Sequence, residues 1–344
     1  MINLKIIVDA FGGDNAPLEI IKGSKMAQDE FGYDILLVGS KEIIKKTAES
    51  NRIDISRMQI IDANDIISMK DEPISIMKSK NRSSMAIGLK LLKEGAGDAF
   101  VSAGNSGALA VGATLTVKRI KGIKRCAFAP VIPKDKGWFM LIDSGANVEC
   151  RPEMLEQFGI MGSVYMENVM HVQKPKVGLV NVGIEPTKGS DMYKHAYDLM
   201  RKNKNINFVG NIEARDIPLD GADVVVADGF TGNIILKFYE GMSKVIFGKF
   251  KTLLMKNFKT KIAALAIKSE LEAMKKESDY KEHGGAPLIG ISKPVFKAHG
   301  SSDAKTFKNA IKLAGRYVEC EAVRIITEKI GEVIEDTHCE ESGN

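Results

Sequence analysis

The sequence is poor in cysteine and lacks long apolar runs, and each shortage excludes a class of protein. It holds four cysteines and one tryptophan in 344 residues. The cysteines are scattered, form no C-x-x-C pair and do not cluster with the five histidines, which argues against a disulfide framework or a zinc site. No apolar run approaches the roughly 20 residues of a membrane-spanning helix. A strand-like segment begins almost at the N-terminus, so we expect no secretory signal and a reducing cytosolic compartment.

The remaining composition is that of an ordinary globular enzyme. Hydrophobic residues make up 44% and charged residues 27% of the chain, enough for a large core. The net charge of +5 is modest and gives no reason to expect a nucleic-acid partner. The charge is unevenly spread, because residues 244–281 contain ten lysines and four acidic residues, whereas residues 332–344 are acidic. The basic stretch suits contact with an acidic protein or an anionic membrane surface.

Strand and helix patterns alternate along most of the chain and predict a three-layer α/β/α fold, a sheet with helices on both faces. Several strands are unbroken apolar runs, such as VVVA at residues 224–227, which is typical of strands buried on both faces. Residues 234–281 read as helix throughout, with lysines between the apolar positions, and predict a long helical projection. We expect residues 1–331 to form one catalytic domain that carries this insertion, followed by an acidic tail at residues 332–344. Strands are expected at residues 4–9, 34–38, 58–62, 98–102, 126–130, 138–143, 176–181, 206–210, 224–228 and, weakly, 295–297, and helices near residues 16–31, 41–50, 83–95, 107–119, 152–170 and 190–203.

Five short loops rich in glycine, asparagine and serine each follow an apolar strand and precede a helix. The carboxyl ends of the strands in an open α/β sheet share one edge, so these loops can converge on one crevice lined by backbone N–H groups. Such a crevice is suited to binding phosphate. The loops are residues 9–14 (DAFGGD), 102–107 (SAGNSG), 143–147 (DSGAN), 181–189 (NVGIEPTKG) and 228–233 (DGFTGN).

Seven motifs in order resemble the bacterial phosphate acyltransferase family PlsX. They are DAFGGD (9–14), SAGNSGAL (102–109), GAN (145–147), FGIMGSVY (158–165), DGFTGN (228–233), GGAPL (284–288) and HGSSD (299–303). The resemblance runs from the first strand to about residue 315. It implies an isocitrate/isopropylmalate-dehydrogenase-like α/β fold, a homodimer without cofactor or metal, and a cytosolic enzyme in peripheral contact with the membrane. The implied reaction moves a fatty acyl group from acyl carrier protein to inorganic phosphate, giving acyl phosphate for a glycerol-3-phosphate acyltransferase of phospholipid synthesis.

The residues themselves suit attack of phosphate on a thioester carbonyl, which requires an anion site and stabilisation of a tetrahedral oxyanion. Lys188, in a glycine-flanked loop, would neutralise phosphate or the developing oxyanion, although most lysines of its kind are simply solvated. Asn233 would donate to the oxyanion, or serve as a helix N-cap. The resemblance places the two important residues of the family at these positions, so we predict that both are catalytic.

Further residues of the loops are expected to bind substrate or phosphate. His299 is expected to bind or to support the site rather than to shuttle a proton, because phosphate needs little help from a base near neutral pH. Asn105 and Ser106 offer side-chain donors between two glycines, although a tight turn would need the same glycines. The full set is Gly104, Asn105, Ser106, Gly107, Asn147, Gly229, Thr231, Gly232, His299 and Ser301.

Four aspartates end strands near the expected crevice and raise the question of a metal. They are Asp9, Asp14, Asp143 and Asp228. Such carboxylates more often cap the next helix or pair with a basic side chain, so we predict no metal site. Two other functions stay open: a phosphotransacetylase that uses coenzyme A and small acyl groups, and a non-catalytic membrane-associated binding protein.

Overall fold

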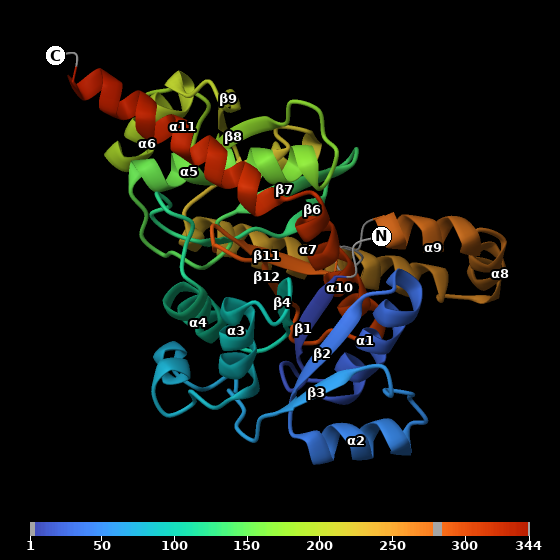
Figure 1. Cartoon of the computed structure of the whole chain (residues 1–344). Helices are drawn as coiled ribbons and strands as arrows, with labels where there is room; N and C mark the ends of the chain where they lie inside the picture. The colour runs from blue at the N-terminus through green and yellow to red at the C-terminus, as the bar shows by residue number, and fades with distance from the viewer. Residues whose placement is uncertain (1–3, 278–283, 343–344) are drawn as a thin grey trace.

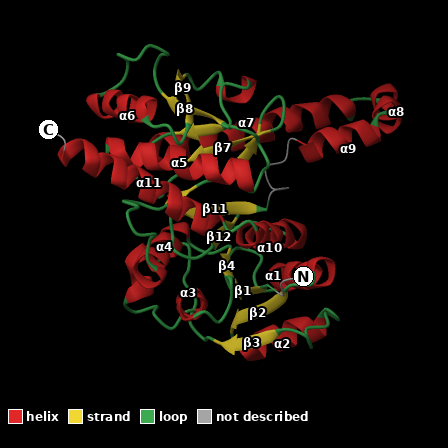
Figure 2. Cartoon of the chain, turned by 45° about the horizontal axis from the view of Figure 1, so that its top comes forward, coloured by secondary structure: helices red, strands yellow, loops and turns green. Residues whose placement is uncertain are grey.

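The computed structural model describes residues 4–277 and 284–342, in which strands and helices alternate along most of the chain (Figures 1 and 2). The strands are β1 (Lys5–Asp9), β2 (Asp34–Gly39), β3 (Gln59–Asp62), β4 (Ala99–Ser102), β5 (Ala127–Phe128), β6 (Val131–Pro133), β7 (Trp138–Ile142), β8 (Lys176–Val180), β9 (Asn207–Ile212), β10 (Val224–Val226), β11 (Gly285–Ile289) and β12 (Val295–Ala298). The α-helices are α1 (Leu18–Phe31), α2 (Lys41–Ser50), α3 (Ser84–Glu94), α4 (Ser106–Gly112), α5 (Pro152–Asn168), α6 (Asp191–Lys202), α7 (Gly229–Leu254), α8 (Phe258–Ala266), α9 (Lys268–Glu277), α10 (Ala304–Glu319) and α11 (Ala322–Ser342).

The strands form two sheets, a division that the alternating pattern does not reveal. The larger sheet has the order β3-β2-β1-β4-β12-β11-β5, and the smaller has the order β6-β7-β10-β8-β9. Both are mainly parallel, except that β11 runs antiparallel to β12 and β5, and β6 runs antiparallel to β7. The chain passes from one sheet to the other between β5 and β6, where only residues 129–130 intervene. Because this crossing is so short, the two sheets are directly joined.

Helices cover both faces of the larger sheet, which confirms the predicted α/β fold class. Ile6 and Val8 of β1 belong to the core cluster that includes α1 and α10, whereas Ile7 belongs to the cluster that includes α3 and α4. Side chains alternate across a strand, so neighbouring residues of β1 pack against opposite helix layers. All three are fully buried. This explains why the strand is apolar at consecutive positions.

The smaller sheet is covered in the same manner. Val224 and Val226 of β10 pack in the cluster of α5, α6 and α11, and Val225 packs with Leu236 and Tyr239 of α7. Figure 2 shows α5 and α11 on one side of this sheet and α7 on the other. The first turns of α7 are therefore part of the domain core, while the rest of the helix leaves it.

The helical projection expected near residues 234–281 is present in the described part of the segment. Helix α7 already begins at Gly229, because the Asp228 side chain accepts a hydrogen bond from Thr231 N and caps it. Helices α8 and α9 then turn back alongside it and extend away from the sheets (Figure 1). Residues 278–281 lie outside the described residues. No described helix combines the length and apolar character needed to cross a bilayer.

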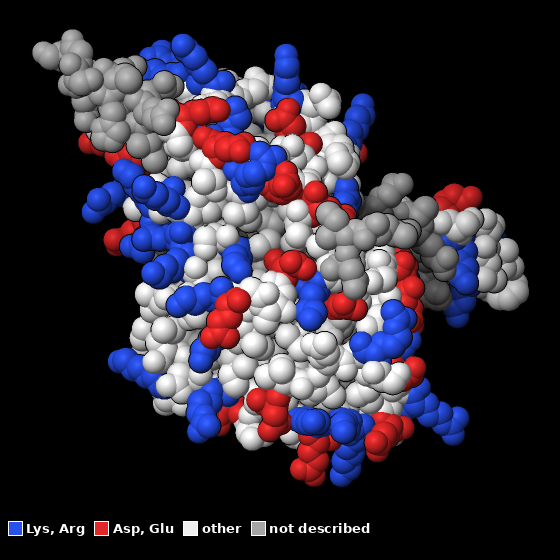
Figure 3. All heavy atoms as spheres, viewed as in Figure 1, with Lys and Arg blue, Asp and Glu red and all other residues white. Residues whose placement is uncertain are grey.

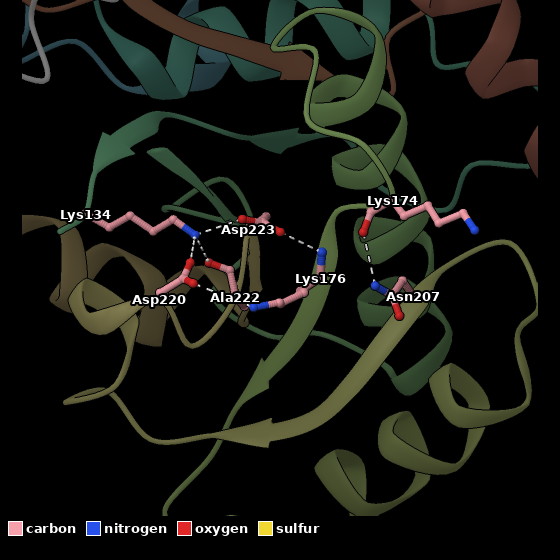
Figure 4. A network of polar contacts seen from close by, with 7 residues as sticks. All are labelled: Lys134, Lys174, Lys176, Asn207, Asp220, Ala222 and Asp223. Atoms are coloured by element: carbon pink, nitrogen blue, oxygen red, sulfur yellow. Dashed lines mark hydrogen bonds and ion pairs between the residues drawn. The ribbon is translucent and has the colours of Figure 1, made fainter. Parts of the chain in front are cut away.

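A buried lysine, Lys134, joins strands of the smaller sheet at the amino ends of β8 and β10 (Figure 4). Lys134 Nζ lies 2.8 Å from Asp223 Oδ1, also pairs with Asp220, and its side chain is only 3% exposed. Asp223 in turn accepts a hydrogen bond of 2.8 Å from Lys176 N at the start of β8. The two carboxylates therefore fix the amino ends of β8 and β10.

The remaining differences from the expected elements have local causes. Strands β6 and β11 are absent from the predicted set, and each is short and contains a proline, which is unfavourable inside a strand. The helix expected at residues 107–119 changes at Gly112 into a wider π-turn, Ala113–Val117. Helix α11 continues across the expected boundary of the acidic tail to Ser342. The domain division at residue 331 stays a prediction.

Candidate active site

A cavity of about 420 Å³ lies between the carboxyl edges of the two sheets. The larger sheet contributes loops that follow β1, β4 and β12, and the smaller sheet contributes the loop after β7 and the first turns of α7. Three of the predicted site residues, Ser106, Asn233 and His299, line this cavity together. The expected convergence of the loops is thus seen for these three, and the polar or charged residues that line the cavity are Asp14, Ser106, Ser144, Asn233, Lys237, Glu240, Lys297, His299 and Thr306.

Buried Asp143 shapes the loop after β7. Its carboxylate accepts hydrogen bonds from the backbone N–H groups of Phe128 (3.0 Å), Ala146 (3.1 Å) and Asn147 (2.7 Å). Burial raises the pKa of this carboxyl, and the hydrogen bonds from Ala146 and Asn147 oppose the shift. The Asn147 amide donates to Asp143 Oδ2 (3.0 Å) and Cys126 O (2.7 Å). Asn147 therefore holds the loop, and its predicted contact with phosphate stays a prediction.

Glycines allow the start of α7 to approach this loop. A Cβ at Gly232 would lie 1.9 Å from Asp143 O, and one at Gly229 would lie 2.5 Å from Asn147 O. Gly229 N also donates to Asn147 O (2.7 Å). Thr231 is drawn to the helix cap, since both its N–H and its hydroxyl lie 2.9 Å from the Asp228 carboxylate. Gly229, Thr231 and Gly232 thus position the helix, and their contact with substrate stays a prediction.

Helix α7 presents Asn233, Lys237 and Glu240 to the cavity on successive turns. The Asn233 amide lies beside Gly145, where a Cβ would be 3.5 Å from Asn233 Oδ1. Within residues 4–277 and 284–342 the Asn233 side chain makes no hydrogen bond, so its two N–H donors are available to a substrate. Lys237 Nζ lies 3.0 Å from the buried carboxylate of Glu240.

The loop after β4 uses most of its polar groups internally. Asn105 Oδ1 caps α4 by accepting from Ala108 N (3.1 Å), while its amide donates to the carbonyls of residues 68, 69 and 71. Gly104 N donates to Ser102 Oγ (3.0 Å). A side chain at Gly107 would meet the ring of Pro73 at 2.7 Å. Ser106 is the residue of this loop that reaches the cavity.

Asp9, at the end of β1, holds the start of the loop after β4 through a hydrogen bond from Ser102. It is buried and accepts hydrogen bonds of 2.6 Å from the hydroxyls of Ser84 and Ser102. Burial raises the pKa of this carboxyl, and the two hydroxyls oppose the shift. Across residues 4–277 and 284–342, no three His, Cys, Asp or Glu side chains are grouped so that they could hold a metal ion.

The loop after β12 is joined by hydrogen bonds to the loop after β1. Asp14 N donates to Gly300 O (2.8 Å), and Asn15 Nδ2 donates to Ser302 O (3.2 Å). His299 Nδ1 accepts from Ser301 N (3.2 Å) and lies 2.9 Å from Ser301 Oγ. His299 lines the cavity, whereas exposed Ser301 is absent from the cavity lining and orients the imidazole through these two contacts.

Lys297 is a site residue that the sequence reasoning missed. It is partly buried on β12, and its ammonium donates to the carbonyls of Ala103 (3.1 Å) and Ala298. Loss of hydration in this position lowers its pKa to about 8, while the charges of Asp9 and Asp14 oppose the shift. The available signal was a lysine two residues before His299 in an otherwise apolar strand.

Lys188 is placed differently from the residues above. It lies on the exposed loop after β8 and is absent from the cavity lining. Its N–H donates to Glu185 O (3.1 Å), and its carbonyl accepts from Asn181 Nδ2 (3.1 Å). Because β8 and β10 are parallel neighbours, this loop shares a sheet edge with the start of α7. The catalytic role of Lys188 stays a prediction.

The fold of the chain occurs in solved structures of other enzymes. A phosphotransacetylase from Streptococcus pyogenes matches with a TM-score of 0.64 and 14% identity over 92% of this chain and 94% of that one. A phosphotransacetylase from Staphylococcus aureus matches with a TM-score of 0.59 and 16% identity over 91% of this chain and 94% of that one. At these identities the likeness shows the shared fold alone.

Sequence relatives are much closer and span nearly the whole chain. A phosphate acyltransferase of Acetivibrio thermocellus is 46% identical over 333 residues, which cover 96% of this chain and 98% of the relative. One from Alkaliphilus oremlandii is 45% identical over 97% of this chain and 99% of the relative. The family model described as "Fatty acid synthesis protein" matches residues 4–324. The chain therefore belongs to the fatty acid synthesis protein family, together with these phosphate acyltransferases.

Proposed function

We propose that this protein is a phosphate acyltransferase that transfers a fatty acyl group from acyl carrier protein to inorganic phosphate. The observation that carries the proposal is the cavity between the two sheets. Its wall holds the Asn233 amide, which makes no hydrogen bond with the described residues, together with the ammonium groups of Lys237 and Lys297 and the imidazole of His299. A polyanionic nucleophile and an oxyanion both require such donors and cations. The phosphate acyltransferases among the relatives support the same reaction class.

The reaction needs no covalent intermediate on the enzyme. A phosphate oxygen attacks the thioester carbonyl carbon, the tetrahedral oxyanion collapses, and the C–S bond breaks. The thiolate takes the proton of the hydrogen phosphate, so the products are acyl phosphate and the carrier thiol. We assign the oxyanion to the Asn233 amide and additional charge neutralisation to Lys188, while His299 helps to bind phosphate.

The basic projection supports an acidic protein as the acyl donor. The exposed lysines of α7 and of the turn that follows it include Lys244, Lys249, Lys251 and Lys256. On the face shown in Figure 3, basic and acidic side chains are interspersed over the sheets, and lysines also appear on the projecting helices. An acidic carrier protein would be steered toward this side, so the rate at low donor concentration should fall as salt rises. A single basic stripe suited to nucleic acid is not seen on this face.

We further propose that the projection makes peripheral contact with an anionic membrane and that the enzyme works as a homodimer. Phe258 and Leu265 of α8 are 77% and 73% exposed, although both are large apolar side chains. Exposed apolar residues set among lysines are suited to the boundary between head groups and acyl chains. Acyl phosphate released there would be available to a membrane-bound glycerol-3-phosphate acyltransferase.

One experiment tests the central proposal. Purified protein is mixed with palmitoyl-acyl carrier protein and inorganic phosphate, and acyl phosphate is trapped with hydroxylamine. We expect phosphate-dependent product from the wild type and a much lower rate of product formation in folded Lys188→Ala and Asn233→Ala variants. Product from acetyl- or butyryl-coenzyme A alone would instead favour a phosphotransacetylase, whose fold this chain shares. No product from any thioester donor would favour a binding protein.

A further inference from the structure

Lys297 holds its charge at the cavity in a fixed position. It sits within the larger sheet, where β12 pairs with β4 and Lys297 lies opposite Ser102. Its ammonium donates to the carbonyls of Ala103 and Ala298, and the side chain lines the cavity. Both partners are neutral, so they orient the positive charge without cancelling it. A lysine has three donors, which leaves one for a ligand.

No carboxylate neutralises Lys297 by contact. Within the described parts of the chain, 4–277 and 284–342, its ammonium makes no ion pair. The acidic groups that act on it are Asp9 and Asp14. Asp9 accepts hydrogen bonds from the hydroxyls of Ser84 and Ser102, and burial raises its pKa. Its negative charge therefore offsets the positive charge of Lys297 only in part.

The carboxylates of Asp14 and Glu240 offset the other ammonium group on the cavity wall, so the attraction for an anion there comes from the Lys297 ammonium. Lys237 adds a second ammonium from α7, opposed by Glu240 at 3.0 Å. His299 and Asp14 complete the set of titratable side chains on the cavity wall. Removing a charge from water is costly unless a partner replaces the lost hydration. A bound anion would supply that partner for Lys297.

We propose that the Lys297 ammonium is the principal binding group for the phosphate dianion in this cavity, which the Ser106 hydroxyl also lines. The inference rests on the proposed acyl transfer and names the residue that holds its second substrate. Lys297 stays protonated while the phosphate oxygen forms its bond to the carbonyl carbon and the C–S bond breaks. Its contribution is to place and neutralise the nucleophile.

The protonation of Lys297 gives this role a pH signature. Its pKa is lowered to about 8 because burial takes water from the ammonium. In the absence of phosphate, the folded protein therefore loses this proton at a lower pH than the unfolded chain does. Phosphate should bind tightly at pH values under 8. Its binding should weaken progressively as the pH rises above 8, because Lys297 loses its positive charge. The other titratable groups that act on Lys297 or line the cavity are Asp9, Asp14, Lys237, Glu240 and His299.

The test varies phosphate at a fixed concentration of palmitoyl-acyl carrier protein and compares Lys297→Met and Lys297→Arg with the wild type. Lys90→Met is the matched control, because Lys90 lies on α3 and its side chain is 70% exposed. We expect Lys297→Met to raise KM for phosphate at least tenfold with KM for the acyl donor unchanged. Lys297→Arg should fall between the two. Inorganic phosphate should raise the melting temperature of the wild type and of Lys90→Met but not that of Lys297→Met.

The outcomes separate this inference from the proposed function. A folded Lys297→Met variant with wild-type KM for phosphate and wild-type stabilisation by phosphate overturns the inference and leaves acyl transfer standing. If the wild type makes no acyl phosphate, and phosphate stabilises the wild type but not Lys297→Met, then the proposed acyl transfer is wrong and the anion site at Lys297 is supported. If Lys297→Met does not fold, the pH dependence decides. KM for phosphate should rise above pH 8 in the wild type but not in Lys297→Arg, and the same profile in both would overturn the inference.

Discussion

The loop after β8 and the strand β12 each bring a lysine to the carboxyl edge of a sheet, but they hold it in different ways. Lys188 is exposed on a loop fixed by hydrogen bonds of its backbone. Lys297 is partly buried on a paired strand, with its ammonium bound to two carbonyls. A fixed charge suits a small substrate that must be placed within the cavity. An exposed loop suits a group that engages only when the large acyl donor arrives.

Loss of Lys188 from the loop after β8 and loss of Lys297 from β12 should change the kinetics in different ways. Loss of a group that binds phosphate equally well before and during reaction should raise KM for phosphate. Loss of a group that acts only on the developing oxyanion should lower kcat instead. The two lysines, together with Asn233 between their sheets, therefore provide a direct way to separate binding from catalysis.

The largest effect is expected at Asn233, which faces the cavity from α7. Asn233→Ala removes two free donors and should lower kcat about 10²–10³-fold, the usual result of losing one oxyanion donor. Asn207→Ala is the matched control, since this exposed asparagine of β9 lies away from the cavity and its side chain donates to Lys174 O. Steady-state rates with saturating phosphate and donor measure the effect. A kcat within threefold of wild type would remove Asn233 from the oxyanion site.

A smaller loss is expected at Lys188. Lys188→Ala should lower kcat roughly 10–100-fold and leave KM for phosphate nearly unchanged, since a positive charge acting on the oxyanion contributes mainly in the transition state. Lys194→Ala, which removes a half-exposed lysine of nearby α6 that pairs with Asp191, serves as the control. If Lys188→Ala instead raises KM for phosphate as much as Lys297→Met does, the two lysines share one role and the contrast between the regions is wrong.

The sequence predicts the fold class and some of the residues that line the candidate cavity because both leave local patterns. Buried strands such as β10 are short apolar runs, and Asn233 and His299 stand in short motifs beside strand ends. Lys297 has no such pattern. Its position at the cavity depends on β12 pairing with β4, almost 200 residues earlier in the chain, and on Asp9 and Asp14 beside it.

The roles of individual loop residues were also beyond the sequence. Asn105 and Asn147 have the composition of a binding loop, yet in the structure their amides are used by neighbouring carbonyls and by Asp143. Whether a side-chain donor is free depends on contacts made by distant segments. The two sheets were unforeseen for a similar reason, since the crossing at residues 129–130 has no distinctive composition.

A third prediction concerns the far end of the smaller sheet, where an effect on stability without an effect on catalysis is expected. Lys134→Met leaves Asp223 without its cation and should lower the free energy of unfolding by about 1–2 kcal/mol, less than for a fully buried pair because Asp220 is half-exposed. Denaturant unfolding measures it. Lys134 holds the pKa of Asp220 below its usual range, so this stabilisation is present near neutral pH and is lost as acid protonates the carboxylate. A large change in KM for phosphate would show that this network reaches the site.

The smallest effect on acyl transfer is expected at the tip of the projection, which lies outside both compared regions. Phe258→Glu combined with Leu265→Glu places two charges on exposed apolar positions of α8 and should reduce flotation with anionic vesicles at least tenfold. Lys188 and Lys297 lie elsewhere, so kcat at a saturating concentration of soluble donor should stay within twofold of wild type. The two added negative charges on the basic projection should raise KM for an acidic carrier protein. Lys90→Glu, a similar charge change at an exposed position of α3, controls for net charge. Unchanged flotation by the folded double variant would reject the lipid contact, and a lost soluble activity would show instead that the tip supports the site, as packing between two copies of the chain would.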